Sequence, residues 1–261
     1  MNSLRKTLRA LATIGLGVIA AAILSAQEPK PQIKNAHTLV AQLYFYSIKD
    51  MPAFEEGYRR HLMWHAGKKD PLVWYAWTID SGLRKGSFVD GTFGVTFAGL
   101  DARPDLSGDG TDFGRNVAPY VTALDAETWT LWPQTSTATP LEERVPGVLL
   151  DVFLLQVDPA QEHSFEAKME GLAKTKRNSA KLSWYRMVRG NNLPTYVLLL
   201  TRRNYADMES AGTRLVEMLA NGYAVSPARV AEVVQPVRNV RVETWSYEPR
   251  LALIPGLALE P

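Results

Sequence analysis

Glu127-Thr128-Trp129, followed by Pro133, returns later in the chain as Glu243-Thr244-Trp245, followed by Pro249, 116 positions further on (243 − 127). Two more matches occur in the same order: Leu72-Val73-Trp74-Tyr75 with Leu182-Ser183-Trp184-Tyr185, at 110 positions (182 − 72), and Phe54-Glu55 with Phe165-Glu166, at 111 (165 − 54). Three matches in register predict a duplicated domain. This period exceeds the roughly 20–50 residues of solenoid repeats, so each copy is expected to be a compact unit that needs the other to complete a core.

Both copies show the same order of predicted elements: strand, helix, strand, strand, helix, strand. The expected bounds are 38–48, 50–69, 72–79, 91–100, 111–124 and 127–132 in the first copy, and 148–157, 158–178, 182–188, 195–201, 206–219 and 240–247 in the second. This order is that of the split β-α-β, or ferredoxin-like, unit, which has one antiparallel sheet with both helices on one face. The first strand is apolar on both sides, which predicts two α+β units packed sheet to sheet with their helices outside.

These elements carry a resemblance to a known superfamily. With the Trp74-Tyr75 strand, the Ser81-Gly82 turn and the glycine-rich strand that follows, the chain resembles the dimeric α/β-barrel superfamily over residues 38–248. The NIPSNAP and antibiotic-biosynthesis-monooxygenase branches look most similar. The resemblance implies a pseudo-dimeric barrel whose two ferredoxin-like units come from one chain.

The predicted organisation is a signal peptide (1–26), a spacer (27–37), a first ferredoxin-like unit (38–133), a linker (134–146), a second unit (147–248) and a C-terminal tail (249–261). The signal rests on Arg5, Lys6 and Arg9, an apolar run over 10–24, and Ser25-Ala26 as a cleavage site. A membrane helix needs about 20 apolar residues, so an uncleaved anchor is the alternative. The expected location is the periplasm or the outside of a bacterial cell, with no membrane association once the signal is removed.

Composition restricts the partners. The 29 basic and 27 acidic residues give a net charge of +2, and there is no arginine-rich block, so no nucleic acid is expected. The chain has no cysteine, which excludes disulfides. No phosphate loop, Gly-x-Gly-x-x-Gly, Gly-x-Ser-x-Gly or paired-cysteine motif occurs. The oligomeric state is left open.

His61 and His65 are the candidate catalytic residues. They lie four residues apart on the first predicted helix, on the side that faces the sheet, where two imidazoles can act together. The corresponding residues of the second copy are Leu172 and Lys176. Three interpretations stay open: buried histidines hydrogen-bonded to tyrosines or backbone, a pair that faces a ligand, and ligands to a metal or haem. The haem interpretation comes from the resemblance, since chlorite-dismutase-like members of the superfamily use a helix histidine as axial ligand.

A pocket between this helix and the sheet is the expected binding site for a small molecule. Its predicted ligand-binding residues are aromatic, with one cation from the second unit: Tyr44, Tyr46, Tyr58, Trp74, Trp77 and Arg186. Aromatic walls with a few polar groups suit a small aromatic or apolar ligand. The alternatives are a cofactor-independent, monooxygenase-like enzyme that uses one of the histidines as base, and a solid barrel that serves as a structural or partner-binding envelope protein.

The acidic stretch 105–112 offers a weak metal candidate, because Asp105, Asp109 and Asp112 resemble part of a calcium loop. The twelfth position is Asn116 instead of glutamate, so we expect an acidic turn that caps the next helix, and we predict no metal and no cofactor, with haem and calcium as the alternatives. Charged residues inside the strands, such as Glu127 and Glu243, are expected to face water or to find a partner.

Overall fold

The computed structural model describes residues 38–174, 181–211 and 214–257. Eight strands form a closed barrel in the order β1-β3-β2-β8-β5-β7-β6-β4, and all neighbouring pairs are antiparallel. The strands are β1 (Val40–Ile48), β2 (Tyr75–Ser81), β3 (Phe88–Val95), β4 (Val121–Leu131), β5 (Leu149–Val157), β6 (Ser183–Arg189), β7 (Thr195–Arg202) and β8 (Val237–Tyr247). The large antiparallel sheet of a mixed α/β protein is therefore present.

The two halves of the barrel have the same strand order. The first four strands lie as β4-β1-β3-β2 and the last four as β8-β5-β7-β6, each the order of a split β-α-β unit. Antiparallel pairing of β2 with β8 and of β4 with β6 joins the halves. Because closure leaves no free sheet edge, the halves cannot separate without breaking both pairs of strands.

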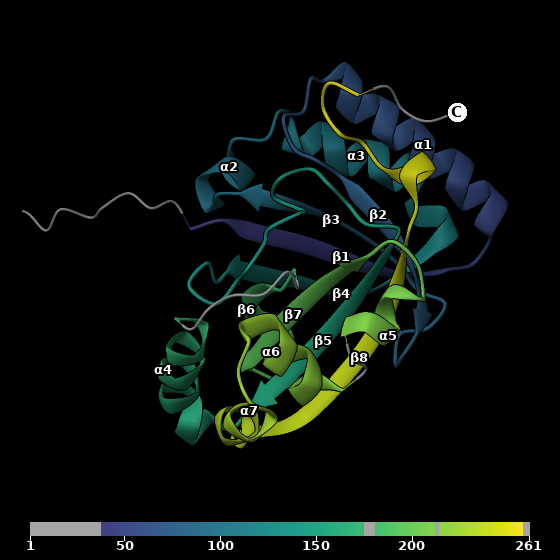
Figure 1. Cartoon of the computed structure of the whole chain (residues 1–261). Helices are drawn as coiled ribbons and strands as arrows, with labels where there is room; N and C mark the ends of the chain where they lie inside the picture. The colour runs from purple at the N-terminus through teal and green to yellow at the C-terminus, as the bar shows by residue number, and fades with distance from the viewer. Residues whose placement is uncertain (1–37, 175–180, 212–213, 258–261) are drawn as a thin grey trace, which may run out of the picture. The chain divides into compact units, whose positions relative to one another are not determined.

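Helices cover the outer face of the barrel wall (Figure 1). α1 (Met51–Gly67) and α3 (Leu106–Asn116) lie against the first four strands, and α4 (Glu162–Ala173), α6 (Leu215–Tyr223) and α7 (Pro227–Val234) lie against the last four. The remaining helical segments are short: α2 (Phe97–Asp101), α5 (Asp207–Ala211), η1 (Ala118–Tyr120), η2 (Pro159–Gln161) and η3 (Pro249–Leu251).

Side chains fill the inside of the barrel. Phe45, Trp77, Trp129 and Trp245 are buried there in one apolar cluster with leucines and valines from the other strands. Trp129 and Trp245 come from the repeated Glu-Thr-Trp sequences, and their rings lie 6.4 Å apart. The interior is therefore a packed core, which leaves the layer between wall and helices as the place for a site.

The repeated glutamates are buried in this interior. Glu127 and Glu243 both contact Arg84, from the turn between β2 and β3, with closest nitrogen–oxygen distances of 2.9 Å. Residues i and i+2 of a strand share a face, so each glutamate lies beside the tryptophan two residues later and accepts a hydrogen bond from its indole. Of the two predicted alternatives, exposure to water is therefore wrong, and both glutamates find a buried partner, as a charge in such a strand must.

Local signals explain the helix that carries the histidines. The Asp50 side chain accepts a hydrogen bond from the backbone N–H of Ala53, and Pro52 occupies the first turn, as both residue types favour at a helix start. Phe54, Tyr58, His61, Leu62 and His65 follow at helical spacing and form the buried face. The predicted cap and the predicted buried side of this helix are confirmed.

The acidic stretch differs most from expectation. Residues 106–116 form helix α3 instead of a loop, so Asp109 and Asp112 lie one turn apart on a helix and cannot wrap around a calcium ion. Asp105 caps this helix through the N–H of Gly108 and pairs with Lys68 at 2.8 Å. The cap was predicted. The predicted helix over 111–124 overlaps α3 but has the wrong bounds: α3 starts at Leu106, although glycines at 108, 110 and 114 disfavour a helix there, and it ends at Asn116 before β4 begins. Packing against α1 outweighs the cost of the glycines.

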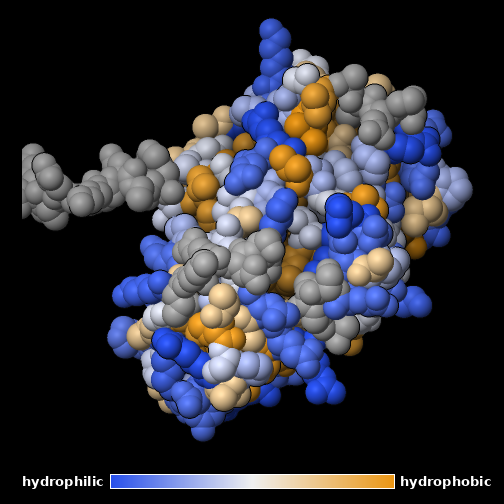
Figure 2. Space-filling view, viewed as in Figure 1, coloured by the Kyte–Doolittle hydropathy of each residue, from blue (hydrophilic) through white to orange (hydrophobic). Residues whose placement is uncertain are grey.

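The second unit also contains a helix that the sequence analysis missed. α7 starts with Ser226 as cap and Pro227 in its first turn. The predicted continuation of the 158–178 helix lies partly outside the described residues, as do the predicted signal and spacer. Among the residues that the structure describes, no helix is both long and apolar enough to cross a bilayer. On the face shown in Figure 2, apolar residues form separate patches among polar ones.

Candidate functional site

A cavity of about 500 Å³ lies between the barrel wall and helices α1 and α3. Its walls are mostly aromatic and apolar, and its polar groups come from β1, α1, β3, α3, β4 and the segment before α3. The lining consists of Tyr44, Tyr46, Tyr58, His61, Leu62, His65, Trp74, Asp90, Arg103, Asp109, Gly110, Phe113, Ala123, Leu124, Asp125 and Ala126. The size and the mixture of walls suit a small organic molecule.

Asp90 is the most unusual group in this lining. It belongs to β3, and its residue is only 5% exposed. Tyr58 donates a hydrogen bond to Oδ2 over 2.6 Å, while Oδ1 is buried without a hydrogen-bond partner in the described structure. Burial raises the pKa of Asp90 to about 7, although the hydrogen bond from Tyr58 works in the opposite direction. A buried acceptor without a partner is costly, so Asp90 is the residue of this lining whose burial most needs an explanation.

The two histidines meet at their Nε2 atoms. His61 Nε2 and His65 Nε2 lie 3.2 Å apart, because the residues are one helical turn apart and both rings lie against the sheet. His61 lies beside Trp64 in a stacked arrangement, and His65 lies against Trp74. Burial lowers the pKa of His61, with a hydrogen bond to Asp112 acting against it.

Carboxylates hold the other nitrogen of each ring. His61 Nδ1 lies 2.8 Å from Asp112 Oδ1, and His65 Nδ1 lies 2.7 Å from Asp70 Oδ2. Asp70 also accepts hydrogen bonds from the Leu72 backbone N–H and from the Trp74 indole. Burial alone would raise the pKa of Asp70, but the hydrogen bonds from His65 and these two groups outweigh it and lower the pKa. Both imidazoles are thus fixed in orientation.

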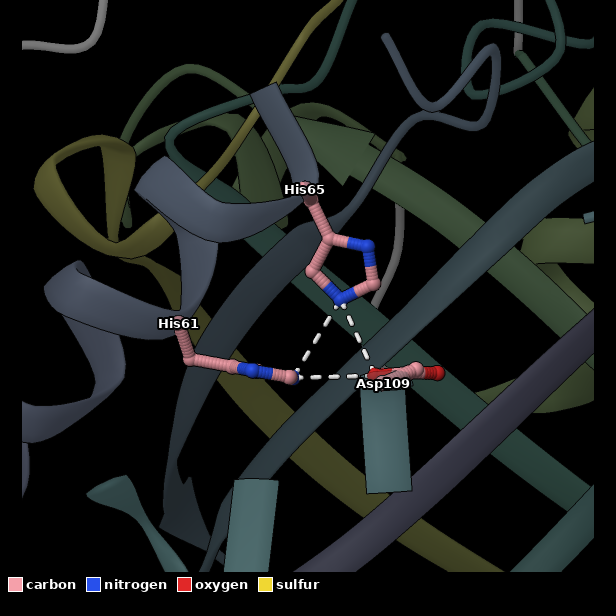
Figure 3. Close-up of side chains that lie close together, drawn as sticks. All are labelled: His61, His65 and Asp109. Atoms are coloured by element: carbon pink, nitrogen blue, oxygen red, sulfur yellow. Dashed lines mark hydrogen bonds and ion pairs between the residues drawn. The ribbon is translucent and has the colours of Figure 1, made fainter. Parts of the chain in front are cut away.

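Asp109 of α3 completes the cluster from the opposite side (Figure 3). Its Oδ1 atom lies 3.4 Å from His61 Nε2 and 3.5 Å from His65 Nε2. Its Oδ2 atom lies 3.5 Å from a guanidinium nitrogen of Arg103. In the described part of the chain, His61, His65 and Asp109 are the group of three whose side chains lie close enough to share one metal ion.

The structure gathers most of the predicted site residues and separates two of them. Tyr44, Tyr46, Tyr58 and Trp74 line the cavity together with the histidines. Trp77 does not, because alternation along β2 turns it into the barrel interior. Arg186 does not either: it lies in the other half, 4.0 Å from the centre of the Trp132 ring, and pairs with Glu166.

Three functional groups escaped the sequence analysis. Asp90 fell in the predicted turn before the third strand, although an aspartate that follows Phe88-Val89 is an unusual polar residue in an apolar stretch. Asp70 and Arg103 lie in connecting segments with no pattern that would place them near the histidines. Only the folded chain brings Asp70 and Arg103 into the cluster around the histidines.

The C-terminal half carries core side chains at positions equivalent to parts of the cavity lining. At the spacing of 111 that joins Phe54 to Phe165, Tyr58 corresponds to Met169 and His61 to Leu172. Both counterparts are fully buried in the apolar cluster of that half. The polar groups of the first half are therefore replaced there by core side chains.

Strand register shows the same replacement for the buried aspartate. Tyr196 takes in β7 the position that Asp90 has in β3, as the pairings with neighbouring strands show. Its ring packs on Phe165 and Trp132, and its hydroxyl bonds Glu166. Aromatic bulk thus occupies the place that is open in the first half.

Comparisons with known proteins identify the fold. No family model matches the chain, and no curated protein does. Two similar structures are proteins described as putative monooxygenases. The one from Lactobacillus acidophilus has 12% identity and a TM-score of 0.52 over 80% of this chain and 94% of that one. The one from Fusobacterium nucleatum has 6% identity and a TM-score of 0.55 over 81% and 93%.

A haem-binding protein from Thermus thermophilus is also similar, with 10% identity and a TM-score of 0.42 over 81% of this chain and 91% of that one. This finding corrects the prediction that no cofactor is involved, since structures similar to this chain include one that binds haem. The prediction of an α+β fold of the ferredoxin-like, barrel-forming kind is confirmed by the strand topology and these likenesses.

The described residues nevertheless fit haem poorly. The cavity presents carboxylates of Asp90, Asp109 and Asp125 where propionate groups would need cations, and the cation in its lining is Arg103. An axial histidine must also present a free Nε2, but here the two Nε2 atoms face each other.

Proposed function

We propose that this protein binds a small, mostly aromatic molecule in the cavity under α1 and α3, and that Asp90 accepts a proton from it. The observation that supports this most directly is Asp90, a buried residue of the cavity lining whose Oδ1 has no hydrogen-bond partner within the described structure. The molecule would carry an acidic O–H or C–H next to an aromatic ring, because such a group can donate to this oxygen and then lose its proton.

The chemistry of Asp90 suits a general base. A base works best when its pKa lies near the operating pH, and burial brings the pKa of Asp90 to about 7. Tyr58 holds the carboxylate in place through Oδ2, which leaves Oδ1 without a hydrogen-bond partner in the described structure. Tyr44, Tyr46, Phe113 and Trp74 supply the apolar walls.

In this proposal the base is Asp90 and not His61 or His65. Their Nδ1 atoms are held by Asp112 and Asp70, and their Nε2 atoms face each other. A monooxygenase-like reaction is the retained alternative for the overall chemistry. Two structures of this fold carry that description, and proton removal from an electron-rich aromatic would be its first step.

Deuterium exchange tests the proposal. Hydroxylated aromatic ketones would first be screened for binding through the change in tryptophan fluorescence, since Trp74 lines the cavity. For each compound that binds, incorporation of deuterium from D₂O at its acidic C–H would be followed by NMR. Asp90→Asn should retain binding and slow exchange by about 100-fold or more, the usual size of a general-base effect.

The matched control is Asp101→Asn, an exposed aspartate on α2 outside the cavity, which should leave exchange unchanged. Equal exchange in wild type and Asp90→Asn would remove Asp90 from the mechanism. If no compound of this class binds, the alternative of a structural or partner-binding protein gains support.

We also propose that the chain is a tandem duplication and that it is exported. The shared strand order and the repeated motifs support a tandem duplication. The basic and apolar N-terminal pattern supports export to the periplasm or beyond the cell, and N-terminal sequencing of the protein from a bacterial culture would test it. The narrower likeness to the NIPSNAP branch stays a prediction from the sequence.

A further inference from the structure

Three hydrogen-bond acceptors converge between α1 and α3. His61 Nε2, His65 Nε2 and Asp109 Oδ1 are separated by 3.2, 3.4 and 3.5 Å. Figure 3 shows that the two imidazoles and the carboxylate point toward a common centre. Lone pairs that face one another at these distances repel unless a metal ion or a proton lies between them.

The outer hydrogen bonds determine where the protons are. A carboxylate is an acceptor, so Asp112 takes the Nδ1–H of His61 and Asp70 takes the Nδ1–H of His65. A neutral ring with its proton on Nδ1 has a lone pair on Nε2. Both rings therefore present lone pairs to each other and to Asp109, in the carboxylate–histidine arrangement that supports metal ligands.

The spacing matches a small tetrahedral ion. Bonds of about 2.0–2.1 Å in tetrahedral geometry put neighbouring ligand atoms about 3.3–3.4 Å apart. The three observed separations lie around this value. Octahedral geometry at the same bond length would need only about 2.8–3.0 Å. Two imidazoles are also an unusual choice for magnesium or calcium, which prefer oxygen ligands.

We propose that His61, His65 and Asp109 bind a divalent transition ion of the zinc type. Three protein ligands leave a fourth position open, and all three residues line the cavity, so a bound molecule or water would complete the coordination. Asp109 uses Oδ1 for the ion and keeps Oδ2 for Arg103. The site would orient an oxygen atom of a ligand in the same cavity that Asp90 lines.

This site uses none of the atoms on which the Asp90 proposal depends, so the two can fail separately. Asp90→Asn should retain the metal, and loss of the metal ligands should leave the Asp90–Tyr58 pair in place. The alternative for the cluster itself is a single proton shared by the two imidazoles. Metal titration distinguishes these outcomes.

The experiment starts from full-length protein freed of metal with a chelator and dialysed. Isothermal titration with Zn²⁺ should give one ion per chain, and Co²⁺ should give the intense visible absorption of four-coordinate cobalt. Zn²⁺ at about 100 times its Kd should raise the melting temperature by about 5–10 °C. Mg²⁺ and Ca²⁺ should do neither.

Matched variants locate the ion. His61→Ala and Asp109→Asn should abolish the cobalt spectrum and weaken zinc binding by more than the roughly 10–100-fold expected when Asp70→Asn removes an outer hydrogen bond. His163→Ala on α4 and Asp101→Asn on α2 change exposed residues of the same types and should bind zinc as the wild type does. Circular dichroism of the metal-free variants checks that they fold.

Failure of the folded wild type to bind Zn²⁺ or Co²⁺ would overturn the proposal in favour of a shared proton. Binding that His163→Ala removes and His61→Ala retains would overturn it as well. If His61→Ala does not fold, Asp70→Asn decides: unchanged zinc affinity in that variant contradicts a site supported by the Asp70–His65 hydrogen bond.

Discussion

Glu127 and Glu243, 116 positions apart in the sequence, share one guanidinium inside the barrel. Each lies 2.9 Å from a nitrogen of Arg84 and accepts a hydrogen bond from the tryptophan two residues later. The guanidinium also lies 3.8 Å from the centre of the Phe45 ring. One cation thus links β4 and β8, from opposite halves of the barrel.

Arg84→Met should therefore destabilise the fold by about 3–5 kcal/mol at pH 7, because it leaves two buried carboxylates without their cation. Burial already raises the pKa of Glu127, and Arg84 opposes that shift. A carboxyl group whose pKa is raised by folding lowers the stability of the protein as the pH increases, so the defect should shrink toward pH 4 as Glu127 is protonated. Urea denaturation at both pH values measures it.

The control for this variant is Arg238→Met. Arg238 pairs with Asp158 on the surface, and exposed ion pairs contribute about 0–1 kcal/mol. A defect of equal size in the two variants would mean that the buried cluster contributes no more than a surface pair.

Asp90 should make the stability of the protein depend on pH. Its pKa is about 7 in the folded protein against an ordinary value of 3.8, so the folded state favours the protonated form. The titratable groups around it are Tyr58 and His65 from α1, Asp109 from α3, and Tyr44 and Tyr46 from β1. The penalty for ionising it is absent below about pH 4, grows as pH rises toward 7 and is complete above that.

Asp90→Asn removes this penalty. The variant should be more stable than the wild type at pH 8 by on the order of 4 kcal/mol, and the difference should vanish near pH 4. Thermal denaturation of both proteins between pH 4 and 8, in the presence of a chelator, tests this. A difference that is constant with pH would mean that Asp90 ionises as an exposed aspartate does.

Gly57 controls how closely α1 approaches the end of α3. A Cβ atom at this position would lie 1.9 Å from the backbone oxygen of Asn116, so Gly57→Ala forces the two helices apart. Since α1 carries the histidines and α3 carries Asp109, the variant should lose about 1–3 kcal/mol of stability and should impair the site.

Gly67→Ala is the matched change on the same helix, because a Cβ atom there has no neighbour within 4 Å. It should be neutral or slightly stabilising. Denaturation of both variants, together with zinc titration, separates a packing effect from a general effect of glycine replacement. Equal stability of the two variants would show that α1 and α3 can move apart without cost.

The sequence predicts the frame of this protein better than its chemistry. The repeat and the β-α-β-β-α-β order identify the barrel, and the Asp50 cap with Pro52 and helical spacing place His61 and His65 on a buried face. These are local patterns, which short stretches of sequence encode directly.

The contacts of the site depend on parts of the chain that no local pattern connects. Asp112 reaches His61 from 51 positions away, and Tyr58 reaches Asp90 from 32. Helix α3, which brings Asp109 and Asp112, forms against its own low propensity because α1 packs on it. Only the folded arrangement of α1, β3 and α3 reveals that these groups meet.

The two halves differ at equivalent positions, where the first half lines a cavity and the second buries core side chains. This difference affects how the protein can evolve. Met169, Leu172 and Tyr196 stabilise the C-terminal half as members of its apolar core, and the closed ring of strands joins that half to the other. Residues around Asp90 can then vary with selection for a new ligand while the molecule as a whole stays folded. Selection can thus change the chemistry of the first half while the second half keeps the protein folded.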